Sequence, residues 1–256
     1  MSKYLVSSGV VAECDIDQEC HYAELWLGTH SKTPNTTQDG QTLSQYVMEN
    51  PQLLGQGIVQ KFGAFLPFLL KVLSIGHPLQ LQIHPTRDEA RELHRKNPRA
   101  FLDDNHKPEM AVALTPFTAL CGFRDPAEIL EIAEVIEDFA DTLGDETLNL
   151  LKKENIKDSE KIKACYNSIF QSDKKADYLD IQKKIKSKVE SLQIKISGGH
   201  EFLTIFDSFE GDPGCFAPFL LNIYKLEPGE AIFVPAGEIH AYISGDCIEV
   251  REGIIY

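Results

Sequence analysis

Residues 226–242 read Leu226-Glu227-Pro228-Gly229-Glu230-Ala231-Ile232-Phe233-Val234-Pro235-Ala236-Gly237-Glu238-Ile239-His240-Ala241-Tyr242. A turn signal at Pro228-Gly229 precedes a short apolar strand, and a second turn signal at 235–237 precedes a strand that carries His240. This order of turn, strand and turn is typical of a small double-stranded β-barrel. A lone histidine in a strand is more often structural, but in this context we interpret His240 as an inward-facing metal ligand.

The rest of the chain adds strands and a few short helices to this framework. Alternating or apolar runs bounded by Pro and Gly predict strands at 79–84, 109–114, 219–226, 231–234 and 239–243. Short helices are predicted at 43–50 and 88–96. The sheet is therefore expected to be discontinuous in sequence.

One long region has the helical period instead. Asp125, Pro126 and Glu128 give an N-cap, a first-turn proline and a capping-box acid, and apolar residues at three- and four-residue spacing follow as far as Gly144. Two more amphipathic stretches cover 146–170 and 173–192. We predict an all-α block at 125–196 beside a mainly β framework of residues 1–124 and 197–256, and the block is either inserted into this framework or appended against it.

Composition and charge limit the possible partners. The 256 residues include 39 acidic and 25 basic side chains and carry a formal charge of −14, which disfavours nucleic acid and anionic membranes. The most apolar stretch, 62–76, contains Lys71 and is too short to span a bilayer. The six cysteines are scattered without a C-x-x-C pair and are expected to be free thiols. The start of the chain resembles a secretory signal only weakly, so we expect a cytoplasmic protein.

The segment 77–85 has strict alternation. It should place Leu79, Leu81 and Ile83 on one face of a strand, and Gln80, Gln82 and His84 on the other. The polar face is either exposed to water or part of a site. Glu109 poses a similar choice, because it begins an apolar run and either points to water or enters the sheet as a carboxylate that needs a partner or a metal.

Gln82, His84, Glu109 and His240 together form a candidate set of four ligands. Two imidazoles, an amide and one carboxylate suit Zn²⁺ better than Ca²⁺ or Mg²⁺, which prefer more oxygen ligands. A single carboxylate leaves the site electropositive, so it can orient a substrate or activate bound water. We expect one Zn²⁺ per chain.

Several motifs in order resemble the type I mannose-6-phosphate isomerases, a cupin family. The matching stretches are 22–30, 66–74, Gln82-Ile83-His84-Pro85, Asn105-His106-Lys107-Pro108-Glu109 and 235–242. The resemblance implies a cytosolic zinc enzyme that interconverts mannose 6-phosphate and fructose 6-phosphate and supplies mannose for GDP-mannose and glycan synthesis. It also implies a helical domain inserted in a catalytic cupin, with a small-molecule sugar phosphate as partner and a monomeric state.

The resemblance also assigns site residues. Gln82, His84, Glu109 and His240 match the zinc ligands, and Glu249, with Lys107 and Lys71, matches the catalytic groups. Gln80, Lys71 and Glu24 are the expected substrate-binding residues. Because one base must serve two adjacent carbons in an enediol reaction, Glu249 is the leading base and Lys107 assists. For Lys71, the alternative is a strand-end lysine whose ammonium group reaches solvent.

Three departures from the family pattern matter. Gln80 stands where the family has a small serine, residues 1–19 do not resemble the family's opening strand, and the given sequence ends at Tyr256, where the family pattern continues toward a second cupin domain. Arg251 lies too early to replace the catalytic arginine of the family. Loss of one charge-stabilising group typically costs on the order of 10²–10³ in rate. The alternative function is therefore a truncated, non-catalytic zinc-binding cupin remnant.

Overall fold

The computed structural model describes residues 23–30, 34–101, 103–171, 178–191 and 196–252. The strands are β1 (Glu24–Leu27), β2 (Phe68–Ile75), β3 (Gln82–Ile83), β4 (Glu109–Ala113), β5 (Phe117–Phe123), β6 (Leu221–Leu226), β7 (Ala231–Val234) and β8 (Ile239–Glu252). The helices are α2 (Leu43–Glu49), α3 (Gln56–Phe62), α4 (Arg87–Lys96), α5 (Pro126–Val135), α6 (Glu137–Leu143), α7 (Asp145–Leu151), α8 (Asp158–Phe170), α9 (Tyr178–Ser191), α10 (Gly199–Phe209) and α11 (Ala217–Leu220), with 3-10 turns η1 (Pro51–Leu54) and η3 (Pro213–Phe216).

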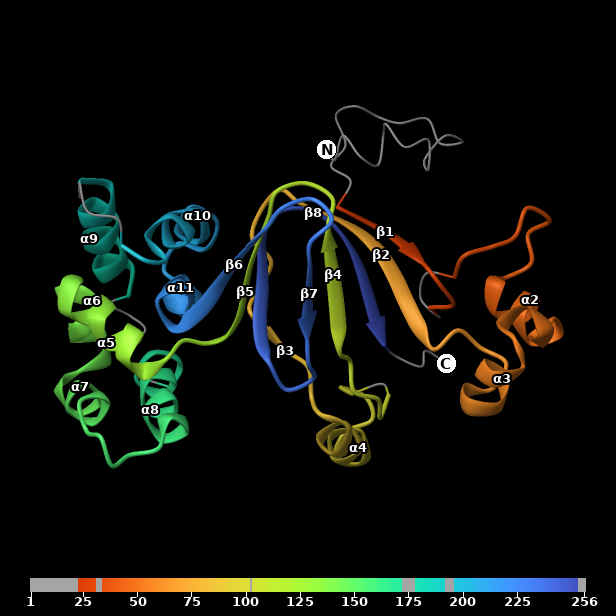
Figure 1. Ribbon diagram of the computed structural model, residues 1–256, viewed down its shortest axis with the longest axis horizontal. Coiled ribbons are helices and arrows are strands. Elements are labelled where there is room, and N and C mark those ends of the chain that lie inside the picture. The colour runs from red at the N-terminus through yellow and green to blue at the C-terminus, as the bar shows by residue number, and fades with distance from the viewer. Residues whose placement is uncertain (1–22, 31–33, 102, 172–177, 192–195, 253–256) are drawn as a thin grey trace.

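The long strand β8 organises the sheet (Figure 1). Its first part pairs with β3 and β5, and its second part, from Gly245 onward, pairs with β2 and β4. Strands β1, β7 and β6 extend the sheet beyond β2, β4 and β5, and every pairing is antiparallel. The two halves of the sheet are thus joined by one continuous strand.

The change of partners in β8 occurs at Gly245. Its backbone has φ 102°, and a Cβ atom at this position would overlap the carbonyl oxygen of Pro116. Only glycine combines this φ with so close an approach of two backbones. The corner turns β8 from one half of the sheet to the other.

The two halves pack against each other through a small apolar core. Leu73 and Ala111 come from one half, and Phe117 and Tyr242 come from the other. The rings of Phe117 and Tyr242 meet edge to face, with centroids 5.3 Å apart. Burial of this surface holds the curved sheet closed around its inner face.

A block of helices leaves the sheet between β5 and β6 and returns beside its starting point. Phe123 at the end of β5 is paired with Leu221 at the start of β6, so α5 to α11 form one long excursion between neighbouring strands. Helix α5 begins where the sequence predicts, because the side chain of Asp125 accepts a hydrogen bond of 2.8 Å from the Ala127 amide.

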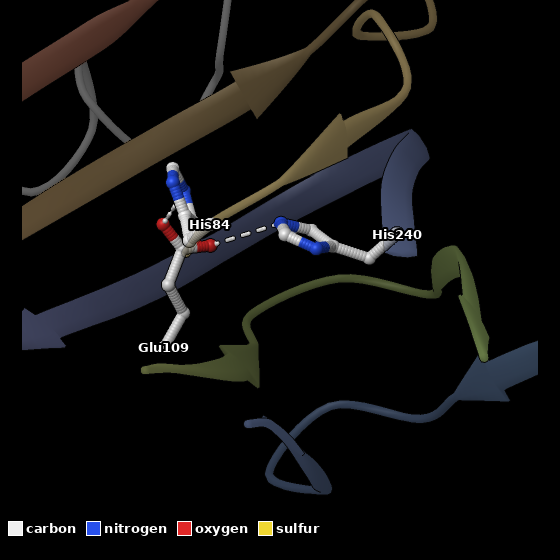
Figure 2. Close-up of side chains that lie close together, drawn as sticks. All are labelled: His84, Glu109 and His240. Carbon is white, nitrogen blue, oxygen red and sulfur yellow. Dashed lines mark hydrogen bonds and ion pairs between the residues drawn. The ribbon is translucent and has the colours of Figure 1, made fainter. Parts of the chain in front are cut away.

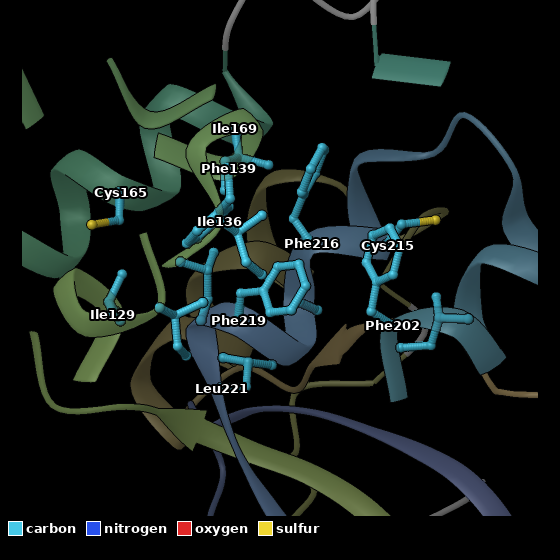
Figure 3. Packing of buried hydrophobic residues seen from close by; sticks show 14 of the residues in the cluster. Ile129, Ile136, Phe139, Cys165, Ile169, Phe202, Cys215, Phe216, Phe219 and Leu221 are labelled. Carbon is cyan, nitrogen blue, oxygen red and sulfur yellow. The ribbon is translucent and has the colours of Figure 1, made fainter. Parts of the chain in front are cut away.

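The helices enclose a second and larger apolar core, drawn in Figure 3. Phe219 stacks on Phe202 with ring centroids 5.2 Å apart and lies 5.1 Å from Phe139. Leu120 of β5 and Ile243 of β8 belong to the same core. The helical block therefore packs directly on the outer face of one half of the sheet. No helix in the described ranges has the length and apolar character needed to cross a membrane.

Several predicted elements have other boundaries, among them the helical stretch predicted at 146–170, which consists of two helices, α7 and α8. The helix predicted from residue 125 to 143 is broken at Ile136, which leaves helical geometry (φ −107°, ψ 89°) while its side chain is buried in the helical core. Helices continue to Leu220, so the strand predicted from 219 begins at Leu221. Phe219 and Leu220 are almost fully buried among helices, and this packing overrides their strand propensity. Of the helix predicted at 173–192, residues 173–177 and 192 lie outside the described residues.

The alternation predicted for 79–84 is also wrong. Only Gln82 and Ile83 pair as strand β3; Leu79 packs on the sheet core, Leu81 packs on the helical core, and Ile83 is 63% exposed. The segment passes between two cores, so its apolar residues do not share one face.

Candidate functional site

Three of the four proposed ligands meet at one point. His84 Nε2 lies 3.0 Å from Glu109 Oε1, and His240 Nε2 lies 3.4 Å from Glu109 Oε2. One ligand atom from each residue lies within 4.8 Å of the others. In Figure 2 the two imidazoles approach the carboxylate from different segments of the chain. Within the described ranges, this is a group of side chains suited to one metal ion.

Strand pairing brings these segments together. His84 follows β3, Glu109 begins β4 and His240 is the second residue of β8. Gln82 lies directly opposite His240 in the β3–β8 pair, so the two side chains share a face of the sheet. Register therefore places the fourth proposed ligand, Gln82, on the face of the sheet that carries His240.

Burial and charge set the ionisation of Glu109 and His240, which are 4% and 1% exposed. Burial opposes ionisation of Glu109, but its contacts with His240 and His84 outweigh burial and hold its pKa well below the usual range. Burial likewise opposes protonation of His240, but Glu109 and the carbonyl of Glu238 raise its pKa. The cluster is a carboxylate between two imidazoles.

The donor set fits a zinc ion. His240 Nε2 is buried without a well-aligned hydrogen bond, while its Nδ1 lies 3.0 Å from the carbonyl oxygen of Glu238. A backbone carbonyl on one ring nitrogen fixes the tautomer and leaves the other nitrogen free to bind a metal. Imidazole and carboxylate ligands are those that Zn²⁺ takes in proteins.

A second charged pair lies on the neighbouring strands. Lys71 Nζ lies 2.9 Å from Glu249 Oε1, and Glu249 is 3% exposed. Burial and the charge of Glu109 raise the pKa of Glu249, although the ammonium group of Lys71 acts in the opposite direction. The structure therefore holds two buried carboxylates whose pKa values are shifted apart, an arrangement common where one group must exchange protons.

Cross-strand register explains the Lys71–Glu249 pair. Trp26 of β1 lies opposite Lys71 of β2, which lies opposite Glu249 of β8. Lys71 Nζ lies 5.2 Å from the centroid of the Trp26 ring, and the indole nitrogen donates a hydrogen bond to Glu24. Glu24 itself is exposed. Its contact with Trp26 joins it to the cross-strand row of Trp26, Lys71 and Glu249.

Two other predicted residues have different surroundings. Lys107 Nζ binds Asp103 Oδ1 at 2.7 Å and the carbonyl of Asn105 at 3.3 Å. Gln80 is exposed and lines a separate cavity of about 250 Å³ beside the helical block. The described contacts therefore join neither residue to the histidine cluster.

Sequence reasoning gave no role to Tyr242 and Trp26. The Tyr242 hydroxyl donates to Glu109 Oε2 at 3.4 Å, and burial and the Glu109 charge raise the pKa of this phenol. Tyr242 stands two residues after His240, so alternation along the strand could have placed both on one face. Trp26 has no comparable signal, because its contact with Lys71 depends on pairing between distant segments.

Comparisons with known proteins point to one family. Residues 3–126 match the model of the phosphomannose isomerase type I catalytic domain. The chain is 37% identical to mannose-6-phosphate isomerase of Macaca fascicularis, covering 97% of this chain and 61% of the relative. It is 38% identical to mannose-6-phosphate isomerase 1 of Arabidopsis thaliana, covering 93% and 58%. The chain thus spans about three fifths of the length of these curated relatives.

Solved structures agree. A mutant of phosphomannose isomerase from Salmonella typhimurium superposes with a TM-score of 0.80 at 30% identity, covering 94% of this chain and 62% of that one. A mannose 6-phosphate isomerase bound with zinc and yttrium gives a TM-score of 0.80 at 28% identity, with 96% and 63% covered. The family match begins at residue 3, and the part of the chain for which we expect no resemblance to the family's opening strand, residues 1–19, lies outside the described residues.

Proposed function

Since the chain belongs to the type I phosphomannose isomerase family, we propose that it is an isomerase that converts mannose 6-phosphate to fructose 6-phosphate and back with one bound Zn²⁺. The observation that carries this proposal is the group of His84, Glu109 and His240 beside the buried Lys71–Glu249 pair. A metal-binding cluster next to a carboxylate of raised pKa is what proton transfer between two adjacent carbons requires.

Gln82, His84, Glu109 and His240 would hold the zinc ion. When bound, zinc supplies a Lewis acid that stabilises negative charge on a sugar oxygen. Tyr242 donates to Glu109 and so orients one ligand. The other proposed ligands keep their positions through the β3–β8 pairing.

Glu249 is the proposed base. It would remove the proton from C2 of open-chain mannose 6-phosphate and return it to C1, through an enediol. A carboxylate of raised pKa is a better proton acceptor than an ordinary one and is nearer the optimum for exchange near neutral pH. Lys71 holds this carboxylate at 2.9 Å and brings a positive charge beside the reacting carbons.

The roles that the family resemblance implies for Lys107, Gln80 and Glu24 are also part of the proposal. Lys107 would assist only after leaving Asp103, Glu24 would contact substrate beside Trp26, and Gln80 would have to turn from the separate cavity that it lines. We also propose a cytoplasmic monomer that supplies mannose for GDP-mannose and glycan synthesis.

For the architecture, we propose a catalytic cupin of residues 1–124 and 197–256 with an all-α insert at 125–196. The pairing of Phe123 with Leu221 supports an insertion between adjacent strands. Helices α10 and α11 lie beyond residue 196 and would extend the insert to Leu220.

A coupled assay of mannose 6-phosphate turnover tests the function. We expect turnover that a chelator abolishes and added zinc restores, and Glu249→Gln should bind zinc but lose turnover. Zinc bound with no turnover in the unaltered chain would instead favour the non-catalytic zinc-binding protein.

A further inference from the structure

A cavity of about 720 Å³ lies at the end of the sheet where β8 finishes. Its walls come from the end of α3, the start of β2, helix α4 and the last residues of β8. We call it the α3–α4 cavity. Its polar lining consists of Lys61, Arg87, Arg91, Asp104, Asn105 and Glu252.

The charge of the α3–α4 cavity differs from that of the chain as a whole. Three cationic side chains face two carboxylates here, in a protein whose formal charge is −14. Arg87 and Arg91 stand four residues apart on α4, so they share one face of the helix. An anion bound by this protein needs such a local group of cations.

The arginines are only loosely engaged. Arg87 lies 3.7 Å from Glu252, and Arg91 lies 3.8 Å from Asp88. Their side chains are 58% and 60% exposed, and ion pairs of this kind contribute little. Arg87 Nη2 also lies 3.4 Å from the ring nitrogens of His106, so a phosphate group would compete with His106 and Glu252 for Arg87, and with Asp88 for Arg91.

One buried donor in the cavity wall has no partner among the described residues. Asn105 Nδ2 is buried without a hydrogen bond, and a donor in this state is costly unless something satisfies it. Beside it, Phe62 and Phe68 line the cavity with apolar surface. An anionic oxygen in the cavity would satisfy the amide.

The α3–α4 cavity adjoins the histidine cluster. The Glu252 amide donates to the carbonyl of Pro108 at 3.1 Å, and Pro108 precedes the ligand Glu109. Arg87 follows the ligand His84 by three residues. The cavity and the cluster therefore share two segments of backbone.

We propose that the α3–α4 cavity binds a phosphate group. Arg87 and Arg91 contribute planar guanidinium groups that match phosphate oxygens, Lys61 adds a third charge, and Asn105 Nδ2 donates from the wall. Resting on the proposed function, we assign this phosphate to the substrate, whose reacting carbons would lie at the cluster. The negative charges of Glu252 and Asp104 oppose phosphate binding. Removing one of these charges should therefore tighten binding, whereas removing an arginine should weaken it.

The test measures binding of inorganic phosphate to the zinc-loaded protein by calorimetry, so it does not depend on turnover. Arg91→Gln should weaken binding about tenfold, since it removes one charge-assisted contact. Glu252→Gln should tighten binding, because it removes a competing carboxylate. Arg95→Gln, on the same helix but outside the cavity lining, is the matched control and should leave binding unchanged.

Measurement of mannose 6-phosphate turnover then shows whether the cavity binds the phosphate group of the substrate or a separate anion. If it is the substrate's own, Arg91→Gln raises KM for mannose 6-phosphate about tenfold with little change in kcat, and inorganic phosphate inhibits competitively. An unchanged KM with altered phosphate binding would mean a separate anion site in the same cavity. If the affinity for phosphate is unchanged in both Arg91→Gln and Glu252→Gln, the proposal is overturned. Phosphate binding without any turnover would count against the proposed isomerase alone.

Discussion

Two buried carboxylates, Glu109 and Glu249, have pKa values shifted in opposite directions although both are nearly inaccessible. Contacts with two imidazoles lower the pKa of Glu109 despite burial, whereas burial and the charge of Glu109 raise the pKa of Glu249. At the scale of single residues, the partners of each group decide its role. Glu109 is suited to stay charged as a ligand, and Glu249 is suited to gain and lose a proton.

The Lys71 ammonium group should control the pH dependence of the proposed isomerisation. It stabilises the ionised form of Glu249, so Lys71→Met raises the pKa of Glu249 further. Below its pKa Glu249 is protonated and accepts no proton. The acid limb of kcat/KM should therefore move to higher pH, with a loss of rate on the order of 10²–10³. Lys71→Arg keeps the charge and should leave the acid limb of the kcat/KM profile near its original pH. If the acid limb does not move in Lys71→Met, the proposed effect of Lys71 on Glu249 is contradicted.

The described cysteines should be inert in the folded protein. Cys121, Cys165, Cys215 and Cys247 are free, and burial, first of all, raises their pKa to about 11 for Cys121 and about 12 for the others. Native labelling by iodoacetamide at pH 8 should be at least about a hundredfold slower than in denaturant. Mass spectrometry of labelled peptides measures this, and rapid native labelling of any of the four would disprove it. Cys14 and Cys20 lie outside the described residues.

At the scale of elements, β8 does most to build the site. One strand carries His240 in its first part and Glu249 in its second, and the corner at Gly245 turns these parts toward different partner strands. The ligand and the proposed base therefore keep a fixed relation through a single backbone. A change at Gly245 should therefore disturb the positions of both His240 and Glu249.

Gly245→Ala should destabilise the fold by about 1–3 kcal/mol from backbone strain alone, and by more because its Cβ meets the Pro116 carbonyl. Gly229→Ala is the matched control. Gly229 has φ 92° but open space around it, so it reports the strain without the overlap. Urea unfolding measures both variants, and equal losses would show that the close approach does not matter.

At the scale of the whole molecule, two apolar cores meet across one half of the sheet. Leu120 and Ile243 belong to the helical core, while their strands β5 and β8 also build the inner core. The helical block and the sheet therefore share strands, and the cluster of His84, Glu109 and His240 joins three segments of the sheet. Binding of a metal ion by these three residues should therefore stabilise the whole fold against unfolding.

Zinc should raise the melting temperature. A ligand at a hundred times its Kd stabilises the folded state by about 2.7 kcal/mol, which for a chain of this size corresponds to roughly 5–10 °C. His240→Ala should abolish this shift. His200→Ala, an exposed histidine on α10, should keep it. Calorimetry with and without chelator measures the effect, and a shift that survives His240→Ala would place the metal elsewhere.

Local signals in the sequence determined several elements. Strand β7 has the predicted bounds of 231–234, β4 begins at the predicted Glu109, and α4 begins one residue before the predicted 88. Turn residues, caps and alternation act over a few neighbours, so they can be read without the fold. The residues of the candidate metal site, His84, Glu109 and His240, were likewise recognisable from their motifs.

The tertiary structure alone decided the rest. The break at Ile136, the exposure of Ile83, the binding of Lys107 to Asp103 and the pairing of Lys71 with Glu249 all depend on which distant segments lie opposite one another. Register between strands and the competition between two cores are properties of the packed chain. A sequence pattern records the faces of an element, but packing decides what each face meets.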